Sequence, residues 1–173
     1  MRYTEHVRYV GLSLGHGANR EAEHWLYTLG LPAGVEACTH LARTPYPHVA
    51  VSLALPAAAE ADLPAVPPEL RAPAGEAAAA HAARRGGRAV LFTGVDSLVD
   101  TVTVADLLAR SAIDRVRVLG GAAPDPAMEI VTRDFVRPEW IDGELTLVVT
   151  PAPRGRLAPF EFPNPTPCCG GAH

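Results

Sequence analysis

The chain has 173 residues and a net charge of −4, with 48% hydrophobic and 20% charged residues, a composition that excludes a disordered chain and a membrane-embedded one. Its arginines cluster only at 83–88, so a nucleic-acid partner is not expected, because binding to the nucleic-acid backbone needs a broad cationic face. No apolar run approaches the roughly 18 residues of a membrane span, and charges interrupt the N-terminal stretch that a signal peptide would need, so we expect a cytoplasmic protein without a membrane partner.

The N-terminal residues predict a strand and then a helix. The strand is expected over 5–15 and the helix over 17–30, and a second strand is expected over 48–55. The helix is predicted because its apolar residues recur on one face. These residues are Ala18, Ala22, Trp25, Leu26 and Leu29.

The stretch 34–43 repeats the helical spacing of apolar residues and predicts a second helix. On that helix Cys38 faces the core, where we interpret it as a small hydrophobic residue. Glu36 and His40 stand at i and i+4 and are interpreted as a solvated salt pair.

The middle of the chain predicts a parallel unit. Residues 56–75 are rich in proline and alanine and are interpreted as a surface excursion. A strand, a helix and a strand then follow one another within 88–121, which predicts a right-handed βαβ unit. The elements expected here are a helix over 76–85, a strand over 88–94, a helix over 103–113 begun by a capping box at Thr103 and Asp106, and a strand over 115–121.

The C-terminal third predicts short strands, and Asp142-Gly143 between two of them predicts a hairpin turn. The sequence therefore predicts a single α/β domain over 1–162, with a mainly parallel sheet core, flanking helices and a C-terminal antiparallel meander. An extended tail is expected over 163–173.

Three predicted strands end in glycine-containing loops, at 15–20, 93–100 and 120–126. If these strands are parallel, the loops share the carboxyl edge of the sheet, where ligands bind in open α/β sheets. The first loop enters a helix and favours an anion, and the second carries two carboxylates and a hydroxyl. The predicted ligand-binding residues are His16, Gly17, Arg20, Asp96, Ser97 and Asp100.

The alternative for both loops is ordinary turn and helix-cap chemistry, in which glycine, aspartate and serine are common. The first loop is a poor dinucleotide fingerprint, because Arg20 stands where glycine or alanine is needed. The chain has no lysine, which excludes a P-loop and suggests a GC-rich bacterial genome.

The tail holds two adjacent cysteines, Cys168 and Cys169, and ends at His173. Thiolates and an imidazole favour soft ions such as copper or zinc, so these three residues are the predicted metal ligands. The cysteine pair resembles the C-terminal vicinal-cysteine arms of mercuric reductases and high-molecular-weight thioredoxin reductases. That resemblance implies a thiol arm that passes metal or electrons to a site elsewhere.

Three functions stay open at this point. The first is an accessory protein that binds a soft metal, copper or zinc, or does thiol chemistry through the tail. The second is an enzyme or binder of a small anionic molecule at the predicted sheet edge. The third is an interaction protein whose proline-rich tail docks in, or is modified by, a protein partner.

Overall fold

A computed structural model describes residues 6–163. The strands are β1 (Val7–His16), β2 (Glu36–Ala42), β3 (His48–Pro56), β4 (Arg88–Leu91), β5 (Thr101–Thr103), β6 (Arg115–Val118), β7 (Glu129–Val131), β8 (Glu139–Ile141), β9 (Glu144–Ala152) and β10 (Arg156–Pro159). The helices are α1 (Asn19–Thr28), α2 (Arg71–Ala82) and α3 (Val104–Arg110), with 3₁₀ turns at Pro68–Leu70, Val95–Ser97 and Pro153–Gly155.

The strands form one mixed sheet of 10 strands in the order β1-β3-β2-β4-β8-β9-β10-β7-β5, and β6 also pairs with β9. The predicted mainly parallel core is wrong. Of the nine strand pairings within residues 6–163, seven are antiparallel, and only β6 with β9 and β7 with β10 are parallel.

The strands of the predicted βαβ unit are not neighbours: β4 and β6 point in the same direction, but β8 and β9 lie between them in the sheet. The apolar run of β4 comes from burial on both faces, which an antiparallel strand between two packed layers also has. An unbroken apolar run therefore does not identify a parallel strand.

Residues 36–42 form strand β2 where the sequence predicted a helix. This strand pairs with β3 along one edge and with β4 along the other. Two ladders of hydrogen bonds outweigh the helical spacing of a few apolar residues. The burial of Cys38 was predicted correctly, since its side chain is fully enclosed.

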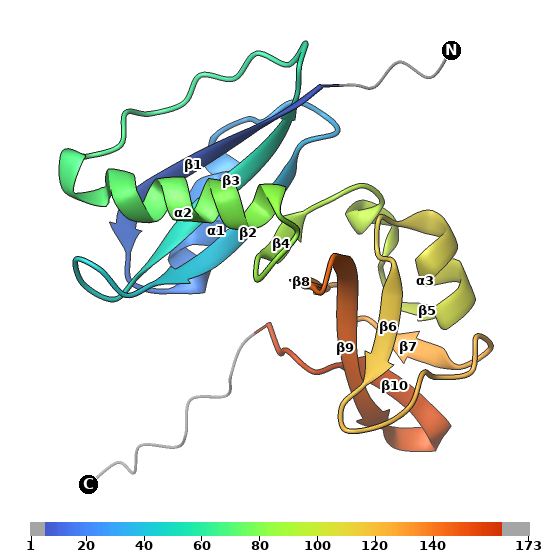
Figure 1. Cartoon of the computed structure of the whole chain (residues 1–173). Helices are drawn as coiled ribbons and strands as arrows, with labels where there is room; N and C mark the ends of the chain where they lie inside the picture. Colours follow the sequence, from blue (N-terminus) through green and yellow to red (C-terminus); the bar gives the residue numbers. More distant parts are fainter. Residues whose placement is uncertain (1–5, 164–173) are drawn as a thin grey trace, which may run out of the picture.

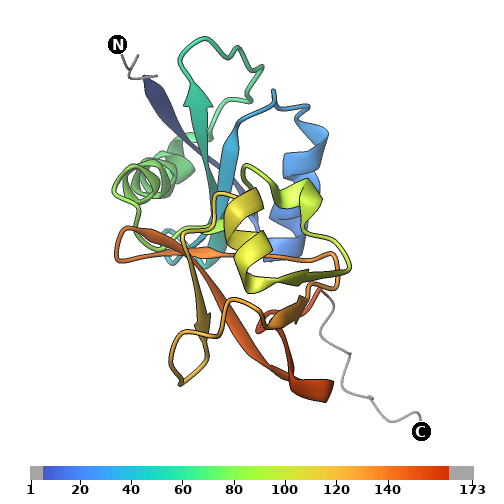
Figure 2. The same cartoon turned by 90° about the vertical axis from the view of Figure 1, so that its right-hand side faces the viewer.

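The N-terminal half has three layers, with α1 and α2 on opposite sides of β1, β3 and β2 (Figures 1 and 2). The helix predicted at 17–30 is α1, and it buries Ala22 and Leu26 against the sheet. On the other face α2 crosses β1 at Gly11, where a Cβ atom would overlap the backbone oxygen of Ala74. Glycine at this position lets α2 approach the sheet closely.

The C-terminal half packs α3 and strands β5 to β10 around a second hydrophobic cluster. Two local predictions are confirmed here. The Thr103 Oγ1 atom accepts a hydrogen bond of 3.1 Å from the backbone N–H of Asp106 and caps α3. Asp142 and Gly143, both with positive φ, turn β8 into β9 as a hairpin.

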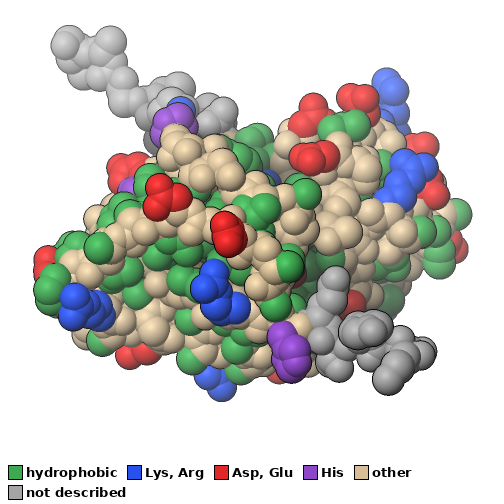
Figure 3. Space-filling model, turned by 90° about the horizontal axis from the view of Figure 1, so that it is seen from above, with side chains coloured by type: hydrophobic (Ala, Val, Ile, Leu, Met, Phe, Trp, Pro, Cys, Tyr) green, Lys and Arg blue, Asp and Glu red, His purple; other side chains and the backbone are tan. Residues whose placement is uncertain are grey.

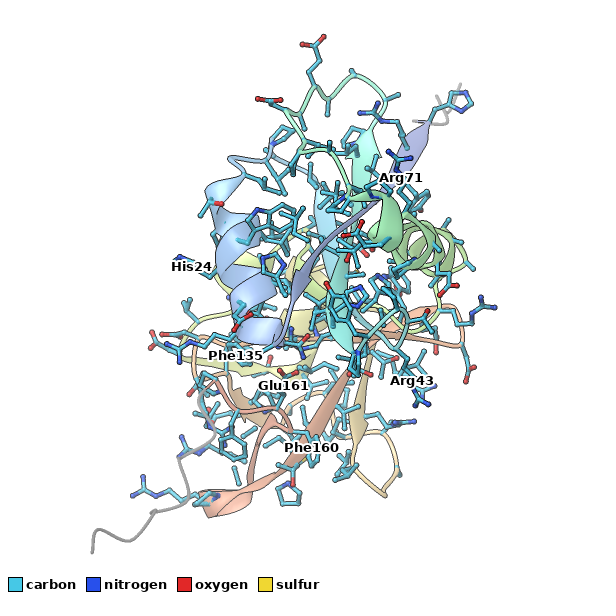
Figure 4. All side chains as sticks on the ribbon, turned by 90° about the vertical axis from the view of Figure 1, so that its left-hand side faces the viewer. His24, Arg43, Arg71, Phe135, Phe160 and Glu161 are labelled. Carbon is cyan, nitrogen blue, oxygen red and sulfur yellow. The ribbon has the colours of Figure 1, made fainter. Side chains whose placement is uncertain are left out.

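An ionic cluster of Glu23, Arg88, Arg137 and Glu161 joins the two halves. The side chains of Glu23, Arg88 and Arg137 are largely buried, whereas that of Glu161 is partly exposed. Arg88 pairs with Glu23 of α1 and with Glu161, which follows β10, while Arg137 pairs with Glu23 at 2.9 Å. Figure 4 shows Phe135 and Glu161 between α1 and the strands of the C-terminal half. Burial raises the pKa of Glu23, but hydrogen bonds and charges from Arg137 and Arg88 outweigh it and hold the pKa below its usual range.

Charged side chains of both signs are scattered over the face drawn in Figure 3. Within the described residues, no helix has the length and apolar content to cross a membrane.

Candidate metal centre

Strand β2 places Glu36, Cys38 and His40 on one face, because side chains alternate along a strand. This face lies under α2, which contributes His81. The Glu36 side chain keeps 21% of its surface exposed, whereas His81 keeps 2%. The polar side chains of Glu36 and His81 need hydrogen-bond partners under this helix, because burying a polar group without hydrogen bonds is costly.

Three ligand atoms of different chemistry converge at this point. The Cys38 Sγ atom lies 3.8 Å from His81 Nε2 and 3.9 Å from Glu36 Oε1, and His81 Nε2 lies 2.9 Å from the same Oε1. All three atoms are within 4.8 Å of one another. We call Glu36, Cys38 and His81 the Glu-Cys-His group.

The Glu36 carboxylate is oriented from the C-terminal half. The indole Nε1 of Trp140, on β8, donates a hydrogen bond of 2.7 Å to Glu36 Oε1. The Arg84 guanidinium lies over the Trp140 ring, 5.3 Å from its centroid. A carboxylate held in this way has less rotational freedom to lose when it binds an ion.

The His81 ring is oriented from the sheet. Its Nδ1 atom lies 2.8 Å from Ser52 Oγ, which lies 2.7 Å from His40 Nε2. Burial, and then the charge of His81, lower the pKa of His40 to about 4, so His40 is neutral near pH 7. A neutral His40 can accept from Ser52 while Ser52 accepts from His81 Nδ1–H. In the metal-free protein His81 Nε2 donates to Glu36 Oε1 at 2.9 Å, and a metal ion held between Glu36 and Cys38 would take the place of that proton.

The Cys38 thiol is unsuited to act as a nucleophile without a metal. Burial, and then the charge of Glu36, raise the pKa of Cys38 well above its usual value, and nucleophilic attack needs the thiolate. A bound metal ion supplies the positive charge that removes the proton. Among residues 6–163 Cys38 is the free cysteine, so a disulfide within this part of the chain is excluded.

The donor set of one sulfur, one nitrogen and one oxygen matches zinc. Tetrahedral zinc, with bonds of about 2.3 Å to sulfur and about 2.0 Å to nitrogen and oxygen, places its ligand atoms roughly 3.3–3.6 Å apart. The separations observed here, 3.8, 3.9 and 2.9 Å, need only small side-chain movements to reach that range.

A pocket of about 360 Å³ opens beside the Glu-Cys-His group. We call it the entrance pocket, and its polar and aromatic lining consists of Tyr9, Glu36, His81, Arg84, Asp114 and Trp140. The rings of Tyr9 and His81 meet in a T-shaped arrangement, with centroids 5.1 Å apart. An ion held by the group would therefore have one side facing a space that a small molecule can enter.

The residues predicted for the first ligand loop lie elsewhere. His16 ends β1 with its ring 5.3 Å from that of Trp25, and burial lowers the pKa of His16. Gly17 lies in the loop that was expected to bind an anion, and its N–H donates 2.9 Å to Glu21 Oε2. Arg20 is exposed.

In the second loop Asp96 and Ser97 form a 3₁₀ turn, and Ser97 Oγ donates to the Gly94 oxygen at 2.7 Å. Asp100 has a positive φ, and its N–H donates to Asp134 Oδ1 at 2.8 Å. Within the described part of the chain no hydrogen bond joins this loop to the first.

The expected common edge depended on parallel strands and is wrong, because successive antiparallel pairings from β1 to β4 give these two strands opposite directions. Binding of an anion by either loop alone stays a prediction. Cys168, Cys169 and His173 lie outside the described residues.

The Glu-Cys-His group was missed because 34–43 was interpreted as a helix. The signal that could have found it is the period of two in Glu36, Cys38 and His40, which places three chemically active side chains on one face of a strand. No local pattern indicates that His81, 43 residues after Cys38, packs against them.

Comparison of the chain with models of protein families, with characterised proteins and with solved structures found no match.

Proposed function

We propose that this protein binds a zinc ion through Glu36, Cys38 and His81 and uses it for hydrolysis of a small substrate in the entrance pocket. The observation that carries the proposal is the convergence of the three ligand atoms within 4.8 Å beside that pocket. Zinc sites with three protein ligands and an open position are typical of enzymes, whereas structural sites are closed by four.

The surroundings of the three residues support a metal rather than a plain packing contact. Trp140 orients the carboxylate and Ser52 orients the imidazole. Such outer hydrogen bonds are a regular feature of zinc sites. Zinc held by three protein ligands lowers the pKa of a water molecule at its open position to about 7 and so provides a nucleophile at neutral pH.

Titration of the metal-free, full-length protein with zinc under reducing conditions tests the proposal. We expect one tight site that is weakened at least about 100-fold in Cys38→Ser and in His81→Ala, because each change removes a ligand. His24→Ala, on the exposed face of α1, should bind as the parent does. Cobalt in place of zinc should give a thiolate charge-transfer band that Cys38→Ser lacks. Parent-like zinc affinity in both ligand variants would exclude this site.

The soft-metal prediction for Cys168, Cys169 and His173 remains a separate proposal that rests on the sequence alone. The double variant Cys168→Ser/Cys169→Ser distinguishes the two. If only the Glu-Cys-His group binds zinc, this variant keeps the full stoichiometry. If the tail binds as well, the variant loses one equivalent while Cys38→Ser loses the other.

A further inference from the structure

We propose that Arg84 anchors an oxyanion group, a carboxylate or a phosphate, on the substrate of the metal centre. This inference rests on the proposed function and adds the chemical class of the substrate. The zinc ion would meet the reacting end of the molecule, and Arg84 its anionic end.

The backbone of Arg84 is held firmly although its side chain is exposed. Its N–H donates 2.9 Å to the His81 oxygen at the end of α2, and its own oxygen accepts from Gly143 N at 3.3 Å. Its φ is +52°, so the chain turns sharply here and directs the side chain over the Trp140 ring. Stacking on an aromatic face limits the positions that the guanidinium takes.

The guanidinium has no acidic partner among the residues that the structure describes. The ion pairs of this part of the chain engage His81, Arg88, Arg110, Arg115 and Arg137. The two acids of the entrance pocket have other contacts: Glu36 accepts from Trp140, and Asp114 Oδ2 accepts from Leu145 N at 2.8 Å. The N–H donors of Arg84 are therefore available to a ligand.

Metal binding strengthens this argument. A zinc ion neutralises the Glu36 carboxylate and the Cys38 thiolate, so neither offsets the charge of Arg84 any longer. A guanidinium can bind a carboxylate or phosphate through two parallel hydrogen bonds. The pocket volume of about 360 Å³ leaves room for a small molecule.

Two matched probes test the anchor on the zinc-loaded, full-length protein. Succinic acid monohydroxamate offers a zinc-binding hydroxamate and a carboxylate, and its monoamide analogue replaces the carboxylate by a neutral amide. We expect the parent to bind the carboxylate probe at least about tenfold more tightly, as measured by calorimetry. Arg84→Gln should bind both probes alike and keep its zinc.

Arg85→Gln is the matched control, because Arg85 is also exposed but lines a different pocket with His40. It should keep the preference of the parent. Arg84→Lys retains the positive charge but lacks the paired N–H donors of the guanidinium, so it should keep only part of the preference for the carboxylate probe. It serves as the test if Arg84→Gln does not fold.

If Arg84→Gln still prefers the carboxylate probe, Arg84 is not the anchor, and the proposed metal centre is not affected by that result. If neither probe binds a protein that holds zinc through Cys38, the open position is wrong and the anchor fails with it. If zinc does not bind through Cys38 at all, the proposed function itself fails.

Discussion

The two ring nitrogens of His81 have different neighbours, and this difference decides what the ring can bind. Ser52 meets Nδ1 at 2.8 Å, whereas Nε2 faces Glu36 and Cys38. If Nδ1 keeps its proton and Nε2 gives up the proton that it donates to Glu36, the lone pair on Nε2 can bind an ion. Ser52 is thus a positioning residue for the proposed metal centre.

Ser52→Ala should lower the zinc affinity about 10- to 100-fold, because loss of an outer hydrogen bond to a ligating histidine has effects of this size. Competition with a chromogenic chelator measures it. Ser97→Ala is the control, since within residues 6–163 its hydroxyl makes one hydrogen bond, to the Gly94 oxygen. Equal zinc affinity in Ser52→Ala and the parent would show that Ser52 does not orient His81.

At the scale of elements, residues 34–43 show how one stretch fits two periods. Its apolar residues fit a helix, whereas Glu36, Cys38 and His40 alternate as in a strand. In a helix Leu41 would share the buried face of Cys38 at the i+3 position, but Leu41 is 81% exposed. The neighbouring strands β3 and β4 decided the outcome, and a local pattern does not contain them.

The approach of α2 to the sheet gives a second prediction. Gly11→Ala should destabilise the fold by roughly 1–3 kcal/mol or more, because the added Cβ overlaps the Ala74 backbone and forces α2 outward. It should also weaken zinc binding, since α2 carries His81. Thermal melting and zinc titration measure the two effects.

Gly75→Ala on the same helix is the control for that change, because a Cβ there meets nothing within 4 Å. It should stabilise the protein by about 0.5–1 kcal/mol, the usual gain from alanine in a helix. If Gly11→Ala melts at the parent temperature, close packing of α2 does not set the position of His81.

At the scale of the whole molecule, the predictions that succeeded were local. The cap at Thr103 and the turn at Asp142-Gly143 each depend on residues within one turn of chain. The mainly parallel core was wrong because strand direction depends on pairings between distant segments, such as Arg88 with Glu139. The Glu-Cys-His group was missed for the same reason, since it and the tryptophan that orients Glu36 come from β2, α2 and β8.

The ionic cluster that joins the halves predicts a pH effect. Because the pKa of Glu23 is held below its usual 4.5, the carboxylate stabilises the fold above that pH, and this contribution is lost as the pH falls through the lowered value. Glu23→Gln should therefore cost about 3–5 kcal/mol at pH 7, because it leaves Arg88 and Arg137 with one partner fewer. The difference from the parent should shrink below about pH 4.5.

Urea denaturation across this pH range measures the Glu23 effect, with Glu76→Gln on the exposed face of α2 as the control. The control should stay within about 0.5 kcal/mol of the parent. A Glu23→Gln deficit that stays constant from pH 7 to pH 3 would contradict the assigned charge pairing.

The hydrogen bond from Trp140 to Glu36 spans 104 positions of the chain. During synthesis from the N-terminus, Glu36, Cys38 and His81 are all made before the residue that orients the carboxylate. A growing polypeptide on the ribosome would thus hold zinc only weakly until strand β8 has emerged and paired with β4. Tight binding of the metal would then be a late step of biosynthesis. A chain that ends before Trp140 would lack the hydrogen bond to Glu36 and bind the ion less tightly.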